Sequence, residues 1–244
     1  MERRRVLITG ASRGIGAAVA HAFASQGDDV AIHYFRSEAQ AKQVAHSCSL
    51  FGVRAFLVCA DLQRPQGVQR LVAAMREEKF FPDVLVNNAG TSTPRLFQEV
   101  SCEEWMNGVL LHQAAPFFCT QAFLPHMIRQ RFGRVINLSS IWGERGAAME
   151  SLYSMAKGAV NAWTRALAKE VASTGVTVNA VAPGAIETEM NASLTPEERL
   201  LLNEEIPMRR MGEPREVASL VTFLASREAS YVTGQVMSPN GGWF

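Results

Sequence analysis

The sequence lacks the features that mark several protein classes. It has four cysteines with no Cys-x-x-Cys pair, which argues against a disulfide framework and favours a reducing compartment, the cytoplasm. The basic first residues are followed by only three apolar ones, 6–8, so we expect no signal peptide. No Pro- or Ser-rich linker and no repeat interrupts the 244 residues, so we expect a single domain over 1–244.

An excess of charge of one sign is also missing. The chain has 24 basic and 23 acidic residues and a net charge of +1, which argues against a nucleic-acid surface. The one basic run, residues 3–5, is expected to be a solvated entrance to the first strand. Residues 105–128 carry no charge and could span a bilayer by length, but they include two prolines and polar residues such as Asn107 and His112. We therefore expect a buried or interface helix there and no membrane partner.

Apolar runs of strand length alternate with helical patterns along the whole chain, which is typical of βαβ units and a parallel sheet. The runs are nearly continuous in their apolar character, which suits strands covered by helices on both faces. The sequence predicts strands near 4–9, 28–34, 53–59, 83–87, 133–139, 176–182 and 234–238, with the longest helices near 102–130 and 151–174. An insertion at 187–213 follows the sixth strand, where such sheets bind ligands, and predicts a substrate lid; a surface helical hairpin is the alternative.

Glycines gather directly after the first strand. Residues 9–16 are Thr-Gly-Ala-Ser-Arg-Gly-Ile-Gly and lead into an Ala-rich helix. Glycines at a strand-to-helix turn let the backbone approach a pyrophosphate, which the helix N-terminus stabilises, although a tight turn can use them without a ligand.

The end of the second strand bears on the choice of cofactor. NAD sites place a carboxylate there for the ribose 2′-hydroxyl, and this chain has none. Arg36 and Ser37, helped by Arg13, offer donors that suit a 2′-phosphate. NADP(H) is therefore the predicted cofactor, with a merely solvated Arg36 as the alternative.

A tyrosine and a lysine one helical turn apart indicate acid chemistry. Tyr153 and Lys157 share one helix face. A ketone that accepts hydride develops negative charge on its oxygen and needs a proton from a nearby acid. We expect Lys157, together with an oxidised nicotinamide, to lower the pKa of the Tyr153 phenol toward neutrality. Ser140, at the end of the fifth strand, would hold the substrate oxygen.

These motifs occur together with Asp61, with Asn-Asn-Ala-Gly at 87–90 and with Pro-Gly at 183–184. Each is weak alone, but in this order and spacing they resemble the short-chain dehydrogenase/reductase family over essentially the whole chain. The resemblance implies an α/β fold with a single doubly wound parallel sheet (Rossmann fold) of about seven strands and helices on both faces. It also implies hydride exchange between NAD(P)H and a carbonyl or alcohol, and its spacing selects Ser140 over Ser139.

The resemblance further implies a role for each matching residue. Ser140, Tyr153 and Lys157 form the catalytic set, and Asp61 meets the adenine. Residues 88–90 meet the adenosine ribose, and 186 and 188 meet the nicotinamide carboxamide. No metal site is predicted. The cofactor-binding set is Gly10, Ser12, Arg13, Gly14, Ile15, Gly16, Arg36, Ser37, Asp61, Leu62, Asn88, Ala89, Gly90, Tyr153, Lys157, Pro183, Gly184, Ile186 and Thr188.

One position departs from the family pattern. Family members usually carry an Asn on the fourth long helix, seven residues after a Trp or similar anchor, whereas counting from Trp105 here reaches His112. In the family this position helps a water connect the lysine to solvent, largely through its backbone carbonyl. His112 could keep that carbonyl and add a titrating imidazole, or it could be a buried histidine with a satisfied hydrogen bond. We include it in the predicted catalytic set with both roles open.

Residues around the site resemble one subgroup more than generic 3-oxoacyl-carrier-protein reductases. The segments 111–116, 139–144, 150–158 and 240–243 resemble Bacillus-type elongation factor P 5-aminopentanone reductases, including the histidine in place of Asn. The resemblance implies reduction of a ketone on a modified lysine of elongation factor P. The aminopentanone carries an ammonium, for which Glu144 and Glu150 are suitable partners, whereas a fatty acyl chain carries no such charge. A solvated rim position is the alternative for each glutamate.

Two other functions stay open. A 3-oxoacyl-[acyl-carrier-protein] reductase would need a basic patch to dock an acidic carrier protein, and Arg129, Arg131 and Arg134 could form one. The other is an inactive nucleotide-binding module that regulates a partner, against which the complete catalytic set argues.

The long helices predict self-association. Their apolar stretches, with Trp105, Phe117 and Trp163, exceed what a one-sided helix needs. In the family these helices pair across a two-fold axis and the last strand pairs across another, which implies a homotetramer, with a dimer as second choice.

Overall fold

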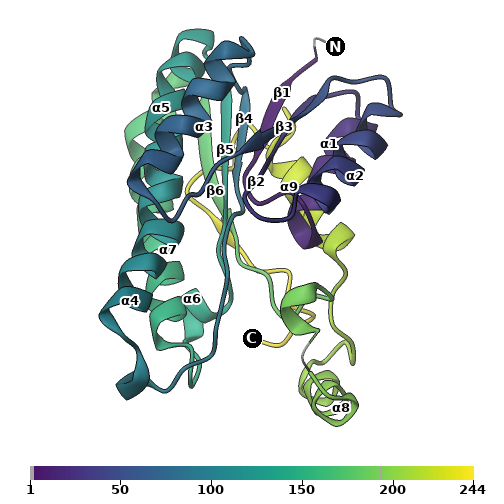
Figure 1. The fold of residues 1–244 in the computed structure, drawn as a ribbon, viewed down its shortest axis with the longest axis vertical. Coiled ribbons are helices and arrows are strands. Elements are labelled where there is room, and N and C mark those ends of the chain that lie inside the picture. The colour runs from purple at the N-terminus through teal and green to yellow at the C-terminus, as the bar shows by residue number, and fades with distance from the viewer. Residues whose placement is uncertain (1–2, 193) are drawn as a thin grey trace.

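A computed structural model describes residues 3–192 and 194–244, which build one seven-stranded sheet between two layers of helices (Figure 1). Neighbouring strands are parallel throughout, and their order is β3-β2-β1-β4-β5-β6-β7. The strands are β1 (Arg5–Ile8), β2 (Asp29–Tyr34), β3 (Ala55–Cys59), β4 (Val84–Asn87), β5 (Gly133–Leu138), β6 (Val176–Val181) and β7 (Val236–Met237). The predicted doubly wound α/β fold is confirmed, and the strand order reverses between β1 and β4, where such folds bind ligands.

The helices form a separate core on each face of the sheet. Helices α1, α2 and α9 bury Phe23, Val44 and Val221 against one face, and α3, α5 and α7 bury Leu71, Phe123 and others against the opposite face (Figure 1). The helices are α1 (Gly14–Ser25), α2 (Glu38–Ser49), α3 (Pro65–Glu77), α4 (Cys102–Val109), α5 (Ala115–Gln130), α6 (Trp142–Arg145), α7 (Ser151–Val171), α8 (Pro196–Glu205) and α9 (Pro214–Leu224).

The central strands are apolar because both of their faces are covered. β4 and β6 are buried at every position, and half of their residues are valine. β-Branched side chains fit this pleated, fully covered surface. The sheet is therefore a rigid support whose carboxyl edge presents the loops that follow each strand.

The predicted helix at 102–130 is continuous but not uniform. Between α4 and α5 lies a π-helical turn, Leu110–Ala114, in which Leu111 and His112 are buried. A π turn contains one residue more than an α turn. Within the described chain, no helix combines the length and the apolarity needed to cross a membrane.

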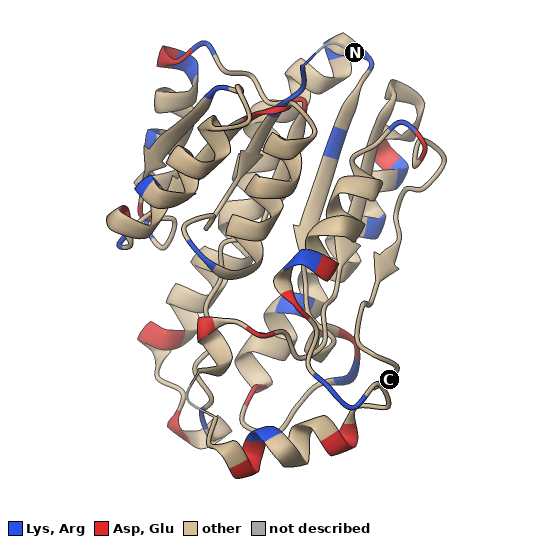
Figure 2. Cartoon of the chain, turned by 90° about the vertical axis from the view of Figure 1, so that its right-hand side faces the viewer, with Lys and Arg blue, Asp and Glu red and all other residues tan. Residues whose placement is uncertain are grey.

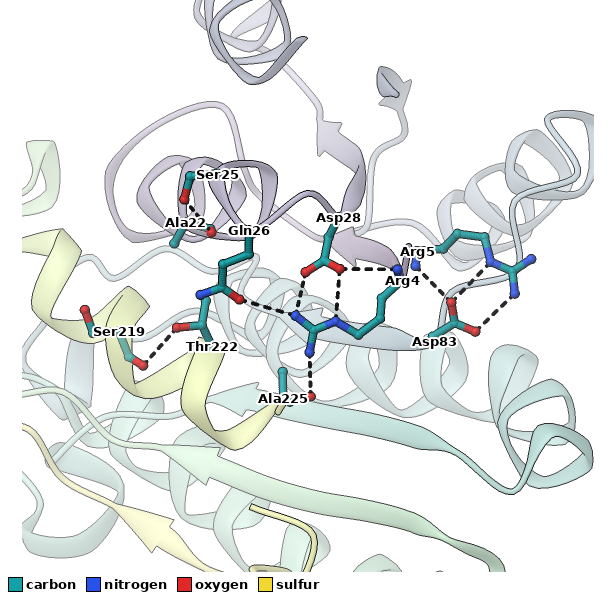
Figure 3. A network of polar contacts seen from close by, with 10 residues as sticks. All are labelled: Arg4, Arg5, Ala22, Ser25, Gln26, Asp28, Asp83, Ser219, Thr222 and Ala225. Carbon is teal, nitrogen blue, oxygen red and sulfur yellow. Dashed lines mark hydrogen bonds and ion pairs between the residues drawn. The ribbon is translucent and has the colours of Figure 1, made fainter. Parts of the chain in front are cut away.

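The basic run at 3–5 is paired rather than simply solvated, so that expectation is wrong in part. Arg4 forms a 2.6 Å ion pair with Asp28 and donates to the carbonyl of Ala225, while Arg5 forms a 3.1 Å ion pair with Asp83 (Figure 3). Asp28 and Asp83 immediately precede β2 and β4, and parallel strands begin at the same edge of a sheet. The two arginines therefore fasten β1 to both of its neighbours at the amino edge.

The insertion at 187–213 contains a short 3₁₀ helix, Glu189–Asn191, and α8, while Ser193 lies outside the described residues. A parallel bridge between Ile186 and Gly212 closes its base, and the N–H of Met208 donates to the carbonyl of Gly241 near the C-terminus. Figure 1 shows α8 beyond the carboxyl edge of the sheet, beside the C-terminus. That is where a substrate lid would lie, and its function as a lid stays a prediction.

Candidate active site

The turn after β1 needs glycine at two positions. Gly10 has a φ of +64°, and a Cβ there would lie 2.8 Å from the Cα of Ala89. A Cβ on Gly16 would meet the carbonyl of Gly10 and would lie 2.6 Å from the amide nitrogen of Asn88. That amide donates to the carbonyls of Thr9 and Gly10, each at 2.9 Å. The backbone at the N-terminus of α1 is thus held open, which fits a bound pyrophosphate.

A buried histidine on β2 holds this loop in place. The N–H of Gly10 donates to Nδ1 of His33 at 3.0 Å, and Nε2 of His33 lies 3.0 Å from the carbonyl oxygen of Ala60. Nδ1 must be unprotonated to accept, so Nε2 carries the hydrogen and donates to Ala60. Burial lowers the pKa of His33 to about 4, which keeps the imidazole neutral. Sequence reasoning missed this role, although a histidine inside an apolar strand was the available signal.

Donors suited to a phosphate ester meet beside the glycine loop. Nη1 of Arg13 donates to the hydroxyl of Ser37 at 3.2 Å and also lies 3.2 Å from the Glu189 carboxylate. The guanidinium of Arg36 is 5.3 Å from the ring of Phe35. Arg13 and Ser37 are therefore joined at the end of β2, with Arg36 next to Ser37 in the chain, and their role as a 2′-phosphate site stays a prediction.

The other predicted cofactor residues follow β3, β4 and β6 at the same edge of the sheet. Oδ1 of Asp61 accepts from the N–H of Gln63 at 3.0 Å. A Cβ on Gly14 would lie 3.4 Å from Thr188, which brings the start of the 187–213 insertion against the glycine loop. The residues present therefore fit a dinucleotide along this edge.

Ser140, Tyr153 and Lys157 come together at the carboxyl end of β5. Lys157 is 5% exposed, and its Nζ donates to the carbonyl of Leu138 at 2.6 Å and lies 5.5 Å from the centroid of the Tyr153 ring. The hydroxyl of Ser139 donates to the backbone carbonyl of Lys157 at 3.3 Å, whereas Oγ of Ser140 accepts from the N–H of Trp142 at 3.2 Å and acts on the pKa of Tyr153. Of the two serines, Ser140 has its hydroxyl on the reacting side.

The pKa of Tyr153 differs from our expectation. Burial raises it to about 12, hydrogen bonding with Ser140 acts against that rise, and the charge of Glu150 adds to it. Burial also lowers the pKa of Lys157 to about 8. In the protein without cofactor, desolvation of the phenolate dominates, and the lowering expected from Lys157 together with an oxidised nicotinamide stays a prediction. A phenol that stays protonated at neutral pH is suited to give a proton to a ketone.

His112 lies against the same tyrosine. Its ring is edge-on to that of Tyr153, with 5.4 Å between centroids, and its Nε2 lies 2.9 Å from the carbonyl oxygen of Thr91. Burial, reinforced by the charge of Lys157, lowers the pKa of His112 to about 3. Its Nδ1 is buried and accepts nothing from the residues that the structure describes. The lowered pKa of His112 argues against an imidazole that titrates near neutral pH, while the alternative of a buried histidine leaves Nδ1 without a hydrogen bond.

A pocket of about 210 Å³ opens beside Tyr153, lined by polar residues from the loop after β4 and from α4. Glu150 lies in this pocket, where Ser92 Oγ donates to its carboxylate at 2.8 and 2.6 Å. Arg95 also lines the pocket but pairs with Glu104, and Glu150 forms no ion pair within the described part of the chain.

The other predicted substrate residue lies elsewhere. Glu144 accepts from the hydroxyl of Ser238 at 2.7 Å and is not part of the pocket lining. It sits beside Trp142, whose ring packs against Trp243 at 5.3 Å. The structure brings only Glu150 to Tyr153. Ser92, which orients Glu150, was missed by sequence reasoning because only the fold joins residues 58 positions apart.

Comparisons with known proteins agree with this architecture. A family model described as enoyl-(acyl carrier protein) reductase matches residues 10–243. The chain is 42% identical to an uncharacterized oxidoreductase, YmfI, of Bacillus subtilis, over 98% of both chains. It is 37% identical to the 3-oxoacyl-[acyl-carrier-protein] reductase FabG of Staphylococcus epidermidis, over 99% of both. Among solved structures, a blue fluorescent protein from a metagenomic library in complex with NADPH superposes with a TM-score of 0.92 at 34% identity, covering 98% of this chain and 97% of that one.

Proposed function

The chain belongs to the short-chain dehydrogenase/reductase family, and on that premise we propose that it is an NADPH-dependent reductase of a ketone carried on another protein. The substrate that the site favours is the 5-aminopentanone group on a lysine of elongation factor P. The observation that carries this choice is the Glu150 carboxylate, which lines the pocket beside Tyr153 and has no cation partner in the described chain.

The cofactor would be held along the carboxyl edge of the sheet. The glycine loop would receive its pyrophosphate, and Arg13, Arg36 and Ser37 its 2′-phosphate. When bound, the reduced nicotinamide supplies the hydride. The arginines neutralise the extra phosphate charge, which is why NADPH is favoured over NADH.

The chain's own residues would complete the reduction. Ser140 donates a hydrogen bond to the ketone oxygen, and Tyr153, protonated at neutral pH, gives its phenolic proton as negative charge develops there. The Lys157 ammonium, near the Tyr153 ring, stabilises the phenolate that this transfer leaves. Glu150 pairs with the substrate ammonium and thereby positions the carbonyl relative to Tyr153.

The runner-up is a 3-oxoacyl-[acyl-carrier-protein] reductase, which the identity to the reductase of Staphylococcus epidermidis favours. The basic patch predicted for carrier docking is not formed as expected. Arg134 is 3% exposed and donates to the carbonyls of Ser226, Gly133 and Gly175, because it is the second residue of β5, at the amino edge of the sheet. Arg129 and Arg131 lie at the C-terminal end of α5, directly before β5 begins. They are therefore at the amino edge of the sheet, whereas Tyr153 lies at its carboxyl edge.

The charge of helix α8, in the insertion beyond the carboxyl edge of the sheet, also supports a cationic substrate. Helix α8 carries four glutamates and one arginine, and Figure 2 shows this acidic helix at the lower end of the molecule. An acidic carrier protein would be repelled there, whereas an ammonium-bearing side chain would be attracted.

A direct comparison of substrates tests the proposal. Purified protein is assayed with NADPH against elongation factor P that carries the aminopentanone and against acetoacetyl carrier protein. We expect a higher kcat/KM with elongation factor P. An equal or higher kcat/KM with the carrier protein would contradict the proposal and favour the 3-oxoacyl-[acyl-carrier-protein] reductase.

We also propose that the protein acts in the cytoplasm as a homotetramer. Phe117, Phe118 and Trp105 are about half exposed on α4 and α5, and Phe117 packs against Trp163 of α7 at 5.8 Å. An apolar face of this kind on neighbouring helices suits pairing with a second copy of the chain.

A further inference from the structure

The imidazole of His33 lies between two segments that belong to different parts of the predicted cofactor site. Its Nδ1 accepts from the N–H of Gly10 in the glycine loop, and its Nε2 donates to the carbonyl of Ala60, each at 3.0 Å. Gly10 precedes the first turn of α1, whereas Ala60 follows β3 and directly precedes Asp61. Because β2 lies between β1 and β3 in the sheet, one side chain of β2 reaches both segments.

The backbone of β2 contacts the same two segments. Its pairing with β1 ends one residue before His33, and the carbonyl of His33 then accepts from the N–H of Ala11 at 2.8 Å. On the other side, the N–H of Ala60 donates to the carbonyl of Tyr34 at 3.0 Å. The imidazole therefore adds a second hydrogen bond on each side and fixes the direction in which these peptide groups point.

The glycine loop is confined at this point. The N–H of Gly10 is held by His33, and a Cβ on Gly10 would lie 2.8 Å from the Cα of Ala89. The N–H groups that follow belong to the start of α1 and have no acceptor in their own helix, so they are the ones that a pyrophosphate can take. Their direction depends on how the chain enters the helix from Gly10.

Packing alone does not explain a histidine at this position. His33 is 3% exposed, and the residues on either side of it, Ile32 and Tyr34, are also buried. A buried imidazole is costly unless its ring nitrogens are hydrogen-bonded, and here both of them are. An aliphatic side chain would fill a buried strand position without that requirement. The two hydrogen bonds therefore distinguish His33 from its neighbours.

We propose that His33 is a positioning residue which couples the pyrophosphate part of the cofactor site to the adenine part. Through Gly10 it orients the donors at the start of α1. Through Ala60 it holds the segment of Asp61, which is predicted to meet the adenine. A ligand that uses both parts should depend on both contacts of His33, whereas a ligand confined to the adenine part should depend on the Ala60 contact alone.

Two amide substitutions remove these contacts one at a time. In His33→Asn, Oδ1 takes the place of Nδ1, so the acceptor for Gly10 is kept and the donation to Ala60 is lost. In His33→Gln, Nε2 of the amide takes the place of the imidazole Nε2, so the donation to Ala60 is kept and the acceptor for Gly10 is lost. Circular dichroism of both variants establishes that they are folded before they are compared.

The readout is the dissociation constant of two ligands, NADPH and 2′-AMP, measured by calorimetry on the full protein. 2′-AMP carries the adenine, its ribose and the 2′-phosphate but no pyrophosphate. We expect His33→Gln to weaken NADPH binding about 3- to 10-fold, the effect of losing one hydrogen bond, and to leave 2′-AMP binding unchanged. His33→Asn should weaken the binding of both ligands by similar factors. A general loss of structure would instead weaken both ligands in both variants.

Two results would overturn the proposal. They are an unchanged affinity for NADPH in either variant, or an equal loss of affinity for 2′-AMP in both. The inference takes the cofactor from the proposed function. Failure of the unmodified protein to bind NADPH would contradict that function, whereas normal binding by the unmodified protein together with either result would contradict only the role of His33.

Discussion

The hydroxyl of Ser92 donates to both carboxylate oxygens of Glu150, at 2.8 and 2.6 Å, across 58 positions of sequence. The contact turns Glu150 into the pocket that Tyr153 also lines. Because no cation of the described chain pairs with this carboxylate, its charge is available to a ligand.

Glu150→Gln should remove a charge-assisted contact to the substrate ammonium and keep the shape of the pocket. We expect kcat/KM for the amine-bearing ketone to fall about 10- to 150-fold, with little change for an uncharged ketone of the same length. Steady-state kinetics with both ketones measure the difference. Ser92→Ala is the matched control, which should produce a smaller loss in the same direction. Equal losses for both ketones would show that Glu150 has only a structural role.

Tyr153→Phe should abolish the proton donor and keep the packing of the ring against His112. We expect turnover to fall by about 10² or more, while NADPH binding, followed by cofactor fluorescence, is retained. A variant that binds NADPH and keeps most of its turnover would rule out Tyr153 as the acid.

Arg36→Asp should reverse the cofactor preference, because a carboxylate repels the 2′-phosphate and accepts from the 2′-hydroxyl. We expect kcat/KM with NADPH to fall about 10- to 150-fold and the value with NADH to rise. Glu189→Gln is the control with the opposite expected effect. It removes the ion pair with Arg13, so kcat/KM with NADPH should rise rather than fall. Equal use of both cofactors by the unmodified protein would contradict the prediction.

His33 should make the protein less stable in mild acid. Its pKa is about 4 in the folded chain and about 6.5 when unfolded, so the unfolded state binds more protons between these values. The stabilisation is complete above pH 6.5 and is lost as the pH falls to 4, by about 3 kcal/mol in total. Urea unfolding between pH 8 and 4 measures this decrease. His33→Asn keeps an acceptor for Gly10 but does not titrate, and its decrease over that range should be shallower.

Self-association should be visible in solution. Light scattering at micromolar concentration should give about four times the 26.7 kDa of one chain. Phe117→Glu places a charge on the exposed apolar face and should shift the protein toward smaller species. A monomer at that concentration would refute the homotetramer.

The sequence predicted the fold because its signals are local and repeated. Each strand is an apolar run, and the parallel order follows from the alternation with helices. The turn at Gly10 and the pairing of Tyr153 with Lys157 could also be predicted. A glycine at a positive φ and two residues on one helix face are short-range relationships.

Contacts between distant segments could not be predicted from the sequence. The pairing of Ser92 with Glu150, and the burial of Arg134, depend on which loops and edges meet in the folded sheet. The raised pKa of Tyr153 was missed for a related reason. The sequence shows that a lysine lies one turn away, but it does not show how completely both groups leave water.

The π turn at Leu110–Ala114 fixes the angular register of the helix that contains it. Because this turn holds one residue more than an α turn, deleting one residue from it would restore regular α geometry while α4 and α5 keep their relative orientation. Deleting a residue from α4 or α5 would instead rotate the two segments against each other by about 100°, the step between successive residues of an α-helix. A one-residue deletion should therefore be tolerated within Leu110–Ala114 better than elsewhere in this long helix, and its effect there should fall on the position of His112.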